Sequence, residues 1–583
     1  MPVMGRLWKY VRNYRGRYIV GSVCLIGTAT MVMAIPALTQ RAIDTVGATD
    51  LGPDRLDRVA TLTAAIVALA ILQAAIRTFS RILIFNAGRD VEYDLRGDLF
   101  GHLLTLHQGY YQRQRTGDLM SRLVNDIGAI RLLLGPGLLT FINTPLYLVY
   151  ASALMMAMDW RLTIAAILPF PIVLWVIRHY IRAMMEATIT LQERLADLSS
   201  FAQENLAGVN VVKSYVRETE RREAFETLNE RYKEQSLVVA RLRGRIFPAM
   251  RTVSSLGTLV VLWYGGSKVV AGELTLGQLV AFIAYLHILA WPVMALGWMI
   301  AIWQRGKAAL IRLGEIFDTV PVIRAPDSPF SPSEMRGDIR FEGVDFCYDD
   351  ETPVVKGIDL EIPAGSSLGI LGRTGSGKST LAGLVPRLFD VTAGSVKVDG
   401  VDVRAWDLER LRGAIGYVPQ DPFLFSSTIE SNIGFGRTHV PEDELARLVE
   451  LSGLDADLAE FPEGLSTPVG ERGVTLSGGQ KQRLTIARAV ARNPRILVLD
   501  DALSSVDAAT ERRILDELDD VVQGRTTIVI SHRVSTVRRF DRIAVVDEGR
   551  ILEAGTHEEL LDLDGPYAEA WRRQRLAEEL EAM

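Results

Sequence analysis

Six uncharged runs occupy the first half of the chain. A helix that crosses about 30 Å of hydrocarbon needs about 20 mostly apolar residues, and four of the runs meet or nearly meet that length. The other two are short, but each extends past a single flanking Arg whose side chain can snorkel to the membrane interface. The pattern predicts six membrane-spanning helices, in the runs Tyr18–Gln40, Val59–Ile76, Leu132–Met158, Leu162–Ile177, Thr252–Ser267 and Leu274–Gln304.

Basic residues between the runs predict how these helices are oriented. The segment before Tyr18 carries five basic residues and no acid, and both Asn86–Arg131 and Arg182–Arg245 are long and rich in Lys and Arg. By the positive-inside rule, these two segments and both ends of the chain lie in the cytoplasm. Leu191–Gln235 contains few helix breakers, so we expect a solvated helical extension there.

The pattern changes after a stretch that contains Pro321, Pro326, Pro329 and Pro332. Hydrophobic residues then fall into short strand-like runs separated by amphipathic helices, which is typical of an α/β domain with a largely parallel sheet. We therefore expect a transmembrane domain over residues 1–320, a linker over 321–336 and an α/β domain over 337–583. The predicted strands are Ile339–Phe346, Ser367–Leu371, Ser395–Val398, Ile415–Val418, Ile496–Leu499, Thr527–Ile530 and Arg542–Val546.

Composition excludes several other classes of protein. The chain has 583 residues, well beyond the roughly 250–300 at which one hydrophobic core stops growing. Its net charge of −6 gives no support to nucleic-acid binding, for which a basic surface is expected. Two cysteines far apart in sequence, Cys24 and Cys347, exclude a disulfide scaffold and a cysteine zinc site.

The strongest local motif is a glycine-rich turn between a predicted strand and a predicted helix. Its glycines let successive backbone N–H groups point at phosphate oxygens, at the positive end of the helix. Lys378 adds a positive charge for the β- and γ-phosphates, and the Ser379 hydroxyl is placed to bind Mg²⁺. The G-x4-G-K-S pattern predicts an ATP-binding phosphate loop, followed by a helix over Thr380–Leu388 whose first residue, Thr380, also belongs to the predicted ATP site. The loop residues are Gly372, Arg373, Thr374, Gly375, Ser376, Gly377, Lys378 and Ser379.

An apolar strand ends in two acidic residues. Ile496–Leu499 leads directly into Asp500 and Asp501, so a carboxylate lies at the carboxyl end of the strand. In P-loop nucleoside triphosphatases, the Asp that holds Mg²⁺ lies at this place. Acidic residues after a strand are often only solvated turn residues, but with the phosphate loop upstream we assign Asp500 to the metal site together with Ser379.

A third segment lies between these two motifs. Ser477, Gly478, Gly479 and Gln480 precede the predicted helix Lys481–Ala491, and glycines before a helix can present N–H groups to an anion. With this segment shortly before the Asp-bearing strand, the chain resembles the ATP-binding cassette transporters over essentially its whole length. The resemblance implies that these four residues complete the ATP site of a second cassette. One cassette and six spans then make half of a transporter, which must dimerise.

Further residues match motifs of that family. The resemblance implies that Tyr348 stacks on adenine, although a plain strand aromatic is an alternative. It implies that Gln420 senses Mg²⁺ as a ligand and contacts the membrane domain, and that His532 touches the γ-phosphate. It places Asp507 in the loop that crosses between the two nucleotide domains. Segments that resemble coupling or partner-contacting regions of the exporters in this family are Tyr110–Gly117, Leu206–Lys213 and Val469–Gly473.

One residue departs from the family pattern. Family members carry Glu after the magnesium Asp, as the base that positions the attacking water, whereas this chain carries Asp501. Asp is one methylene shorter, and a misplacement of about 1 Å can cost around 10²-fold in rate. The pattern resembles the impaired subunit of bacterial heterodimeric exporters, which implies a partner chain with the catalytic Glu. A homodimer in which Asp501 still hydrolyses ATP, for example through a bridging water, is the alternative.

These features predict an ATP hydrolase that exports a small hydrophobic or amphipathic substrate across a prokaryotic cytoplasmic membrane. Its cofactors are ATP and Mg²⁺, and its partners are a second half-transporter and the lipid bilayer. Two other functions stay open, an importer with the exporter fold and an ATP-gated channel or regulator. Six spans exclude a soluble P-loop kinase. Trp298 and Met299 in the last run suit an adaptable cavity, but they suit lipid contact equally well, so the substrate is not fixed.

Overall fold

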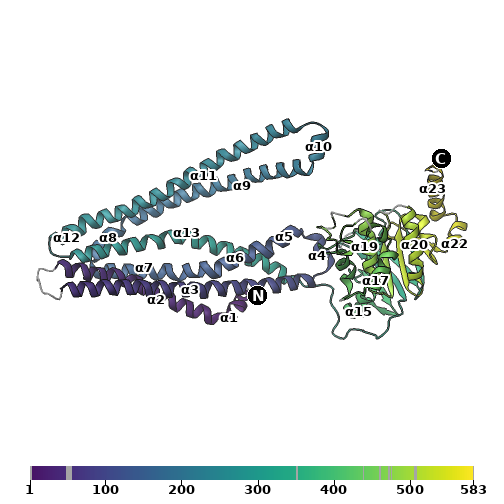
Figure 1. Cartoon of the computed structure of the whole chain (residues 1–583), viewed down its shortest axis with the longest axis horizontal. Coiled ribbons are helices and arrows are strands. Elements are labelled where there is room, and N and C mark those ends of the chain that lie inside the picture. Colours follow the sequence, from purple (N-terminus) through teal and green to yellow (C-terminus); the bar gives the residue numbers. More distant parts are fainter. Residues whose placement is uncertain are drawn as a thin grey trace. The chain divides into compact units, whose positions relative to one another are not determined.

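The chain forms two compact units. The computed structural model describes residues 3–47, 55–349, 352–437, 439–458, 461–470, 473, 476–504 and 508–581. The first unit comprises Met1–His102 and Gly117–Asp318, and the second comprises Leu103–Thr116 and Thr319–Met583. The first is helical, and the second contains two β-sheets (Figure 1). Residues 103–116, expected within the transmembrane domain, thus belong to the second unit.

Long helices build the first unit. Three helical stretches among the described residues are long and apolar enough to span a membrane: Arg15–Gly47, Arg55–Thr105 and Thr116–Met158. The other three predicted runs fall on α8–α9, on α11–α12 and on α13, which also include residues outside the described side chains. The elements are α1 (Val3–Asn13), α2 (Arg15–Gly47), α3 (Arg55–Thr105), α5 (Thr116–Ser121), α6 (Ile127–Leu132), α7 (Leu138–Met158), α8 (Trp160–Ile167), α9 (Pro169–Ala207), α10 (Val209–Ser214), α11 (Glu218–Val260), α12 (Gly266–Val270) and α13 (Leu276–Asp318), with π-helical turns at Arg122–Asp126, Leu133–Gly137 and Val261–Gly265.

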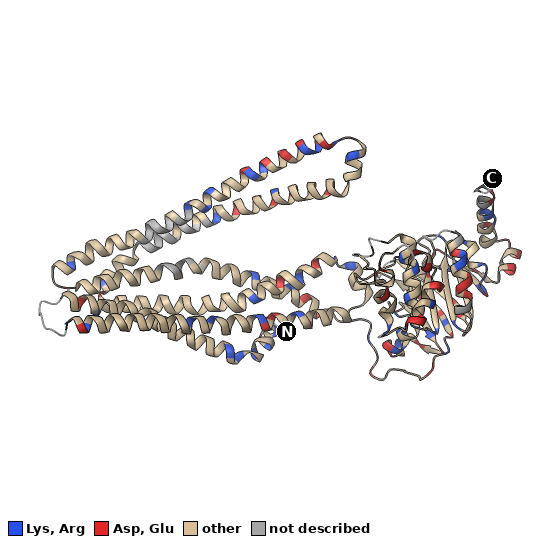
Figure 2. Cartoon of the chain, viewed as in Figure 1, with Lys and Arg blue, Asp and Glu red and all other residues tan. Residues whose placement is uncertain are grey.

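Helices α9 and α11 form a hairpin that diverges from the other helices of the unit (Figure 1). The helical extension predicted over Leu191–Gln235 is present, but it is divided among three helices. α9 ends before Gly208, and Val216 adopts a left-handed backbone with φ 54° just before α11 begins. The short α10 lies between them at the tip. Figure 2 shows alternating acidic and basic residues along α11 near this tip and mostly uncharged residues at the opposite end, as expected for a helix that leaves a membrane.

A row of acids on α3 bonds to side chains of α1 and of the segment where α2 begins. Asp90, Asp94 and Asp98 recur every four residues and therefore share one helix face. The hydroxyls of Tyr14 and Tyr10 donate to Asp94 and Asp98, each at 2.8 Å, and Arg17 pairs with Asp90. The end of the bundle that contains α1 is thus held by specific polar contacts.

The second unit contains a six-stranded sheet and a four-stranded sheet. Five strands of the larger sheet run parallel in the order β9-β3-β8-β7-β6, and β10 is added antiparallel to β9. The smaller sheet is antiparallel in the order β2-β1-β4-β5. The strands are β1 (Ile339–Cys347), β2 (Pro353–Ile362), β3 (Ser367–Leu371), β4 (Ala393–Val398), β5 (Val401–Asp402), β6 (Ile415–Val418), β7 (Ile496–Asp500), β8 (Thr526–Ser531), β9 (Arg542–Asp547) and β10 (Arg550–Gly555).

Short helices surround the larger sheet, and each buried strand alternates between two cores. In β7, Leu497 and Leu499 face the core shared with α19, whereas Ile496 and Val498 face the core shared with the smaller sheet. This period of two buries both faces of the sheet. The helices are α4 (Gln108–Arg113), α14 (Lys378–Leu384), α15 (Leu408–Gly413), α16 (Ile429–Ile433), α17 (Glu442–Leu451), α18 (Asp455–Leu458), α19 (Gly478–Ala491), α20 (Ala508–Val522), α21 (Val534–Val537), α22 (His557–Asp562) and α23 (Pro566–Glu581), with 3₁₀ turns at Val403–Ala405, Gly434–Gly436 and Gly464–Ser466.

The seven predicted strands are all present, at most two residues longer than expected. The sequence prediction missed β2, β5 and β10, which lie in or add to antiparallel pairs. The helix after the phosphate loop begins earlier than predicted, at Lys378, and ends at Leu384. It does not reach Leu388, because Pro386 and the left-handed Arg387 (φ 52°) follow.

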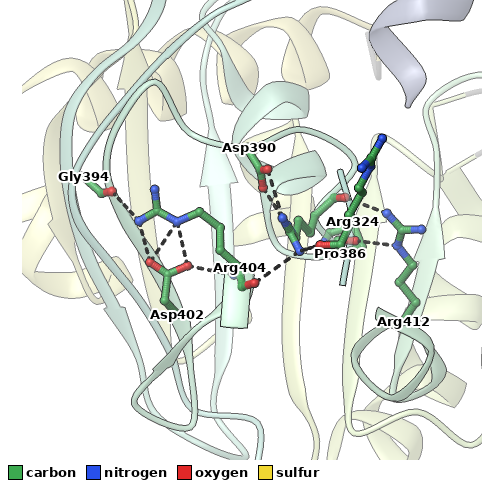
Figure 3. A network of polar contacts seen from close by, with 8 residues as sticks. Arg324, Pro386, Asp390, Gly394, Asp402, Arg404 and Arg412 are labelled. Atoms are coloured by element: carbon green, nitrogen blue, oxygen red, sulfur yellow. Dashed lines mark hydrogen bonds and ion pairs between the residues drawn. The ribbon is translucent and has the colours of Figure 1, made fainter. Parts of the chain in front are cut away.

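The proline-rich stretch, Pro321–Pro332, is part of the second unit. The amide of Phe330 donates to the carbonyl of Ala405 at 2.8 Å, and its ring meets the edge of Trp406 with centroids 4.9 Å apart. Arg387, which is 4% exposed, pairs with Asp390 and donates to the carbonyl of Arg324 at 3.0 Å. Figure 3 shows this network, which continues through Arg412 to Pro386 and through Arg404 to Asp402 and Gly394.

Candidate nucleotide-binding site

The phosphate loop joins the buried strand β3 to α14, and two of its glycines are required by the backbone. Gly375 and Gly377 have φ of 84° and 99°, in the left-handed region that favours glycine. A Cβ on Gly377 would lie 2.8 Å from the carbonyl oxygen of Val354, and one on Gly372 would lie 2.1 Å from that of Val546. The loop is therefore a tight concave turn at the N-terminus of a helix, where anions bind.

The ammonium of Lys378 bonds within this loop. It donates to the carbonyls of Gly372 at 2.9 Å and Arg373 at 2.6 Å, and to the Ser376 hydroxyl at 3.3 Å. Burial lowers the pKa of Lys378, and the nearby carboxylates of Asp501 and Asp500 oppose that shift. The charge is thus held where phosphates would enter.

Ser379 and Asp500 meet at the carboxyl end of the sheet. The Ser379 hydroxyl donates to Oδ1 of Asp500 at 2.9 Å, and Asp500 is 2% exposed. Burial raises the pKa of Asp500 to about 6, although the Ser379 hydrogen bond lowers it. A hydroxyl beside a buried carboxylate is a pair of hard oxygen ligands, so these residues fit Mg²⁺. Gln420 is exposed, and the described contacts include no hydrogen bond from it to either residue.

Asp501 and His532 face each other beside this pair. Oδ1 of Asp501 lies 3.1 Å from Nδ1 of His532. The Asp501 backbone is left-handed, with φ 47°, and its amide donates to the carbonyl of Ile530 at 3.0 Å. Its own carbonyl accepts a hydrogen bond from Nε2 of Gln482 at 3.4 Å. The short acidic side chain is thus held on an unusual backbone and directed at the histidine.

The segment Ser477–Gln480 opens α19 and caps it. The Ser477 hydroxyl accepts from the amide of Gln480 at 3.2 Å, and Oε1 of Gln480 accepts from the amide of Ser477 at 2.8 Å, which is a capping box. Nε2 of Gln480 donates to Asp457 at 3.0 Å. Ser477 and Gly478 are exposed, so the helix N-terminus is open to an anion from outside. Asp507 and residues 471–472 of the predicted partner-contacting segment lie outside the described residues.

Tyr348 lies between the phosphate-loop helix and two aromatic rings. Its hydroxyl is 3.0 Å from the hydroxyl of Thr380, and either oxygen can donate. The rings of Phe346 and Phe389 meet it edge-on, with centroids 4.9 and 5.3 Å away. The Tyr348 side chain still leaves 40% of its surface exposed, enough to stack on a base.

Comparison with known proteins identifies the two halves. Residues 18–293 match the family described as the ABC transporter transmembrane region, and residues 355–504 match the family described as ABC transporter. The chain is 36% identical to the probable multidrug resistance ABC transporter ATP-binding/permease protein YheI of Bacillus subtilis, over 98% of each chain. The chain belongs to the ATP-binding cassette (ABC) transporter family.

Other relatives refine this assignment. The chain is 33% identical to the multidrug resistance-like ATP-binding protein MdlA of Escherichia coli, over 98% of this chain and 96% of that one. A solved bacterial Atm1-family ABC exporter with ATP bound is 29% identical and has a TM-score of 0.79, covering 96% of this chain and 99% of that one. The chain is therefore an exporter-type ABC half-transporter that binds ATP and couples its hydrolysis to transport across the membrane.

The structure of this ABC transporter brings together some of the predicted site residues and not others. Ser379 contacts Asp500, Tyr348 contacts Thr380, and Asp501 contacts His532. Gln420 and the segment Ser477–Gln480 have no described hydrogen bond to that group. Sequence reasoning missed Gln482, which reaches the Asp501 carbonyl, and Phe389, which packs on Tyr348. Both are buried or half-buried and carry no motif of their own, so only the fold identifies them.

Proposed function

We propose that this ABC half-transporter pairs with a different chain and that its own phosphate-loop site hydrolyses ATP slowly. The observation that carries the proposal is the geometry of Asp501. Its carboxylate is one methylene shorter than that of Glu and bonds to His532 at 3.1 Å. A general base must come within about 2.6–3.2 Å of the proton that it takes. A carboxylate drawn back by about 1 Å costs around 10²-fold in rate.

The phosphate-loop residues support ATP binding at this slow site. Lys378 is held beside the loop and can exchange its carbonyl partners for phosphate oxygens. Ser379 and Asp500 would hold Mg²⁺, with Gln420 as a further ligand. Mg²⁺, when bound, would neutralise charge that develops on the phosphates. Tyr348 would stack on adenine, and His532 would contact the γ-phosphate and orient Asp501.

Two exposed apolar surfaces support dimerisation. The tip of the α9–α11 hairpin exposes large apolar side chains, which a soluble surface rarely gathers in one place; they are Leu206 (74%), Val209 (40%), Val211 (61%), Tyr215 (75%) and Val216 (81%). The second unit exposes an aromatic group of Phe423, Phe425 and Phe435, in which the rings of Phe425 and Phe435 stack with centroids 4.4 Å apart. We propose that the tip of one subunit, a coupling region, docks on the aromatic group of the other.

The ATP cycle then follows from two facing half-sites. The phosphate loop of each subunit binds ATP, and residues like Ser477–Gln480 of the other subunit close over it. Closure is transmitted through α4 and α10 to the membrane helices, which turn outward, a two-state change biased by ligand. Hydrolysis at the partner's phosphate loop, which this chain's Ser477–Gln480 completes, resets the pair. Asp507 would lie in the loop between the two nucleotide domains.

Substrate class and membrane orientation extend the same proposal. The relatives named for multidrug resistance favour a small hydrophobic or amphipathic substrate, and the exposed Trp298 on α13 suits such a ligand. The basic segments favour a multi-pass protein of the prokaryotic cytoplasmic membrane, with both termini and the nucleotide-binding domain in the cytoplasm. We propose a transmembrane domain over 1–320, a linker over 321–336 and a nucleotide-binding domain over 337–583. Residues 103–116 interrupt the first range, because they pack with the second unit.

The decisive experiment compares catalytic changes in the purified transporter with its native partner. Asp501→Glu should raise turnover at this chain's phosphate loop by about 10- to 100-fold, because it restores the reach of the base. Changing the partner's catalytic Glu to Gln should abolish ATPase activity of the wild-type pair, and Asp501→Glu should restore part of it. Full ATPase activity from the isolated chain as a homodimer would contradict both the slow site and the second chain. Uptake of a labelled compound into inside-out vesicles tests export, whereas ATP-dependent current without accumulation would favour a channel.

A further inference from the structure

Helix α4 belongs to the nucleotide-binding unit although it comes from the N-terminal half of the chain. The backbone at Gly109 lies against the ring of Phe389, since a Cβ there would be 3.8 Å from a ring carbon. At the other end of α4, Nη2 of Arg113 donates to the backbone carbonyl of Tyr348 at 2.8 Å. The predicted coupling region thus contacts the tyrosine proposed to stack on adenine, 235 residues away in sequence.

Tyr348 is held at its ring, its hydroxyl and its carbonyl by three different elements. Its ring meets Phe346 of β1 and Phe389, and its hydroxyl pairs with Thr380 of α14. It follows the last residue of β1 and lies beyond the paired register of that strand, which ends at Cys347. The Arg113 guanidinium therefore supplies the contact that fixes the carbonyl and hence the plane from which the ring projects.

The chain on either side of Phe389 is held by an ion pair. Phe389 lies between Arg387 and Asp390, and these two form an ion pair with distances of 2.7 and 3.1 Å that is largely buried. The same guanidinium donates to the carbonyl of Arg324, and Arg412 donates to the carbonyl of Arg387 at 2.8 Å (Figure 3). The hydrogen bond from Arg113 to the Tyr348 carbonyl therefore links α4 to these aromatic residues.

We propose that Arg113 is a positioning residue for adenine, through which α4 sets the affinity of the site for the base of ATP. The inference rests on the proposed role of Tyr348. Movement of α4 changes the placement of Tyr348, whereas the phosphate cradle is held separately, by bonds of Lys378 within the loop and of Ser379 to Asp500. Linkage is reciprocal, so a bound adenine biases α4 to the same degree. Binding of the adenine base, in addition to binding of the phosphates, thus affects the position of the coupling helix α4.

A ligand that has phosphates but no adenine distinguishes a role of Arg113 in positioning adenine from a general role in the fold. In purified full-length transporter, Arg113→Met keeps the aliphatic stem but removes the donor, and we expect it to weaken MgATP binding by about three- to tenfold, the range of one hydrogen bond. Binding of magnesium tripolyphosphate, measured by the same calorimetric titration, should be unchanged. In a pair that carries Asp501→Glu in this chain and Gln in place of the partner's catalytic Glu, turnover occurs at this chain's own site, and there Arg113→Met should raise KM while kcat stays constant. Arg113→Lys, which can still donate to the carbonyl, should restore most of the affinity.

Two further variants make each outcome decisive. Arg410→Met removes another exposed arginine, one that donates to the carbonyl of Pro332 at 3.0 Å, and should leave both affinities unchanged. Tyr348→Ala should weaken ATP but not tripolyphosphate; if it weakens neither, the proposed adenine platform is wrong and the inference falls with it. If Tyr348→Ala weakens ATP binding and Arg113→Met does not, the inference alone is wrong. An equal loss of ATP and tripolyphosphate binding in Arg113→Met would make Arg113 a support of the fold and would also overturn it.

Discussion

Two helix N-termini in the nucleotide-binding unit face phosphate in the proposed cycle, and they differ in how their polar groups are satisfied. At α14, a buried carboxylate, Asp500, has a pKa raised to about 6, and Lys378 donates to carbonyl and hydroxyl groups of its own loop. At α19, Ser477 and Gln480 cap each other and Asp457 anchors Gln480. The N-terminus of α14 is thus prepared for a cation and a phosphate ligand. At the N-terminus of α19, in contrast, the capping side chains already satisfy one another. Asp501, which departs from the family pattern, lies in the phosphate-loop site beside α14. A change at Asp501 therefore leaves intact the segment Ser477–Gln480, which completes the partner's ATP site in the proposed cycle.

A negative charge at the N-terminus of α19 is expected to have the largest effect on ATPase activity, and so it is the strongest test of this comparison. Gly478→Asp places a carboxylate in the first turn of α19, where it favours the helix but repels the γ-phosphate of ATP held by the partner. We expect the ATPase activity of the pair to fall by about 10²- to 10³-fold, as when a preorganised donor is removed from an active site. The equivalent change in the partner would affect only the slow site. Equal losses from the two changes would show that both sites hydrolyse ATP.

Loss of the metal-binding hydroxyl affects the N-terminus of α14 alone. Ser379→Ala removes the group that donates to Asp500 at 2.9 Å. We expect MgATP affinity at this chain's phosphate loop to fall by about 10- to 100-fold. Affinity for ATP in EDTA should change little. The matched control is Ser366→Ala, whose hydroxyl donates to the carbonyl of Pro363. If ATP binding in EDTA fell as much as MgATP binding, Ser379 would serve the phosphates and not the metal.

A second comparison, between fully buried and half-exposed strands, explains how far the sequence predicts the fold. The parallel strands were predicted closely because both faces are buried, so β3 and β7 appear as unbroken apolar runs. In β2 the run is interrupted by the left-handed Gly357 and alternates with exposed polar residues, which hides the strand. The predicted extension over Leu191–Gln235 has the composition of a helix, but nothing in composition indicates that Val216 turns the chain back.

Motifs predict site residues whose partners are also in motifs. Ser379 and Asp500 were assigned to one metal site from sequence, and their side chains do meet. The contacts of Arg113 with Tyr348 and of Phe389 with Tyr348 join segments far apart in the chain through single side chains. Such contacts depend on tertiary packing, for which a local pattern carries no signal.

The raised pKa of Asp500 predicts that its ionisation destabilises the metal-free protein, to a degree that depends on pH. The carboxyl has a pKa of about 6 when folded and about 3.9 when unfolded, so the folded state holds the proton more tightly. Stability is therefore lost as pH rises between these values, and the full cost remains above pH 6. Asp500→Asn removes the cost and should raise the Tm more at pH 7.5 than at pH 5, by about 2–4 °C, for a difference of about 1 kcal/mol. The measurement is thermal unfolding of the full-length chain in EDTA without nucleotide. The same Tm gain at both pH values would mean that the carboxyl is not strained by burial.

The smallest effect is expected at Asp457, which accepts a hydrogen bond from Gln480 at the N-terminus of α19. Asp457 accepts from Gln480 at 3.0 Å and pairs with Arg483 at 2.5 Å, with only 15% and 11% of the two charged side chains exposed. Asp457→Asn keeps the shape but weakens this pair, so we expect a loss of about 0.5–1.5 kcal/mol of stability. ATPase activity of the pair should stay within about twofold, because the cap between Ser477 and Gln480 is retained. The control Asp455→Asn removes a pair with Arg513 that is almost half exposed, and such pairs contribute about 0–1 kcal/mol. A loss of activity as large as that of Gly478→Asp, without a matching loss of stability, would show that α19 depends on Asp457 to present its N-terminus and is not complete in itself.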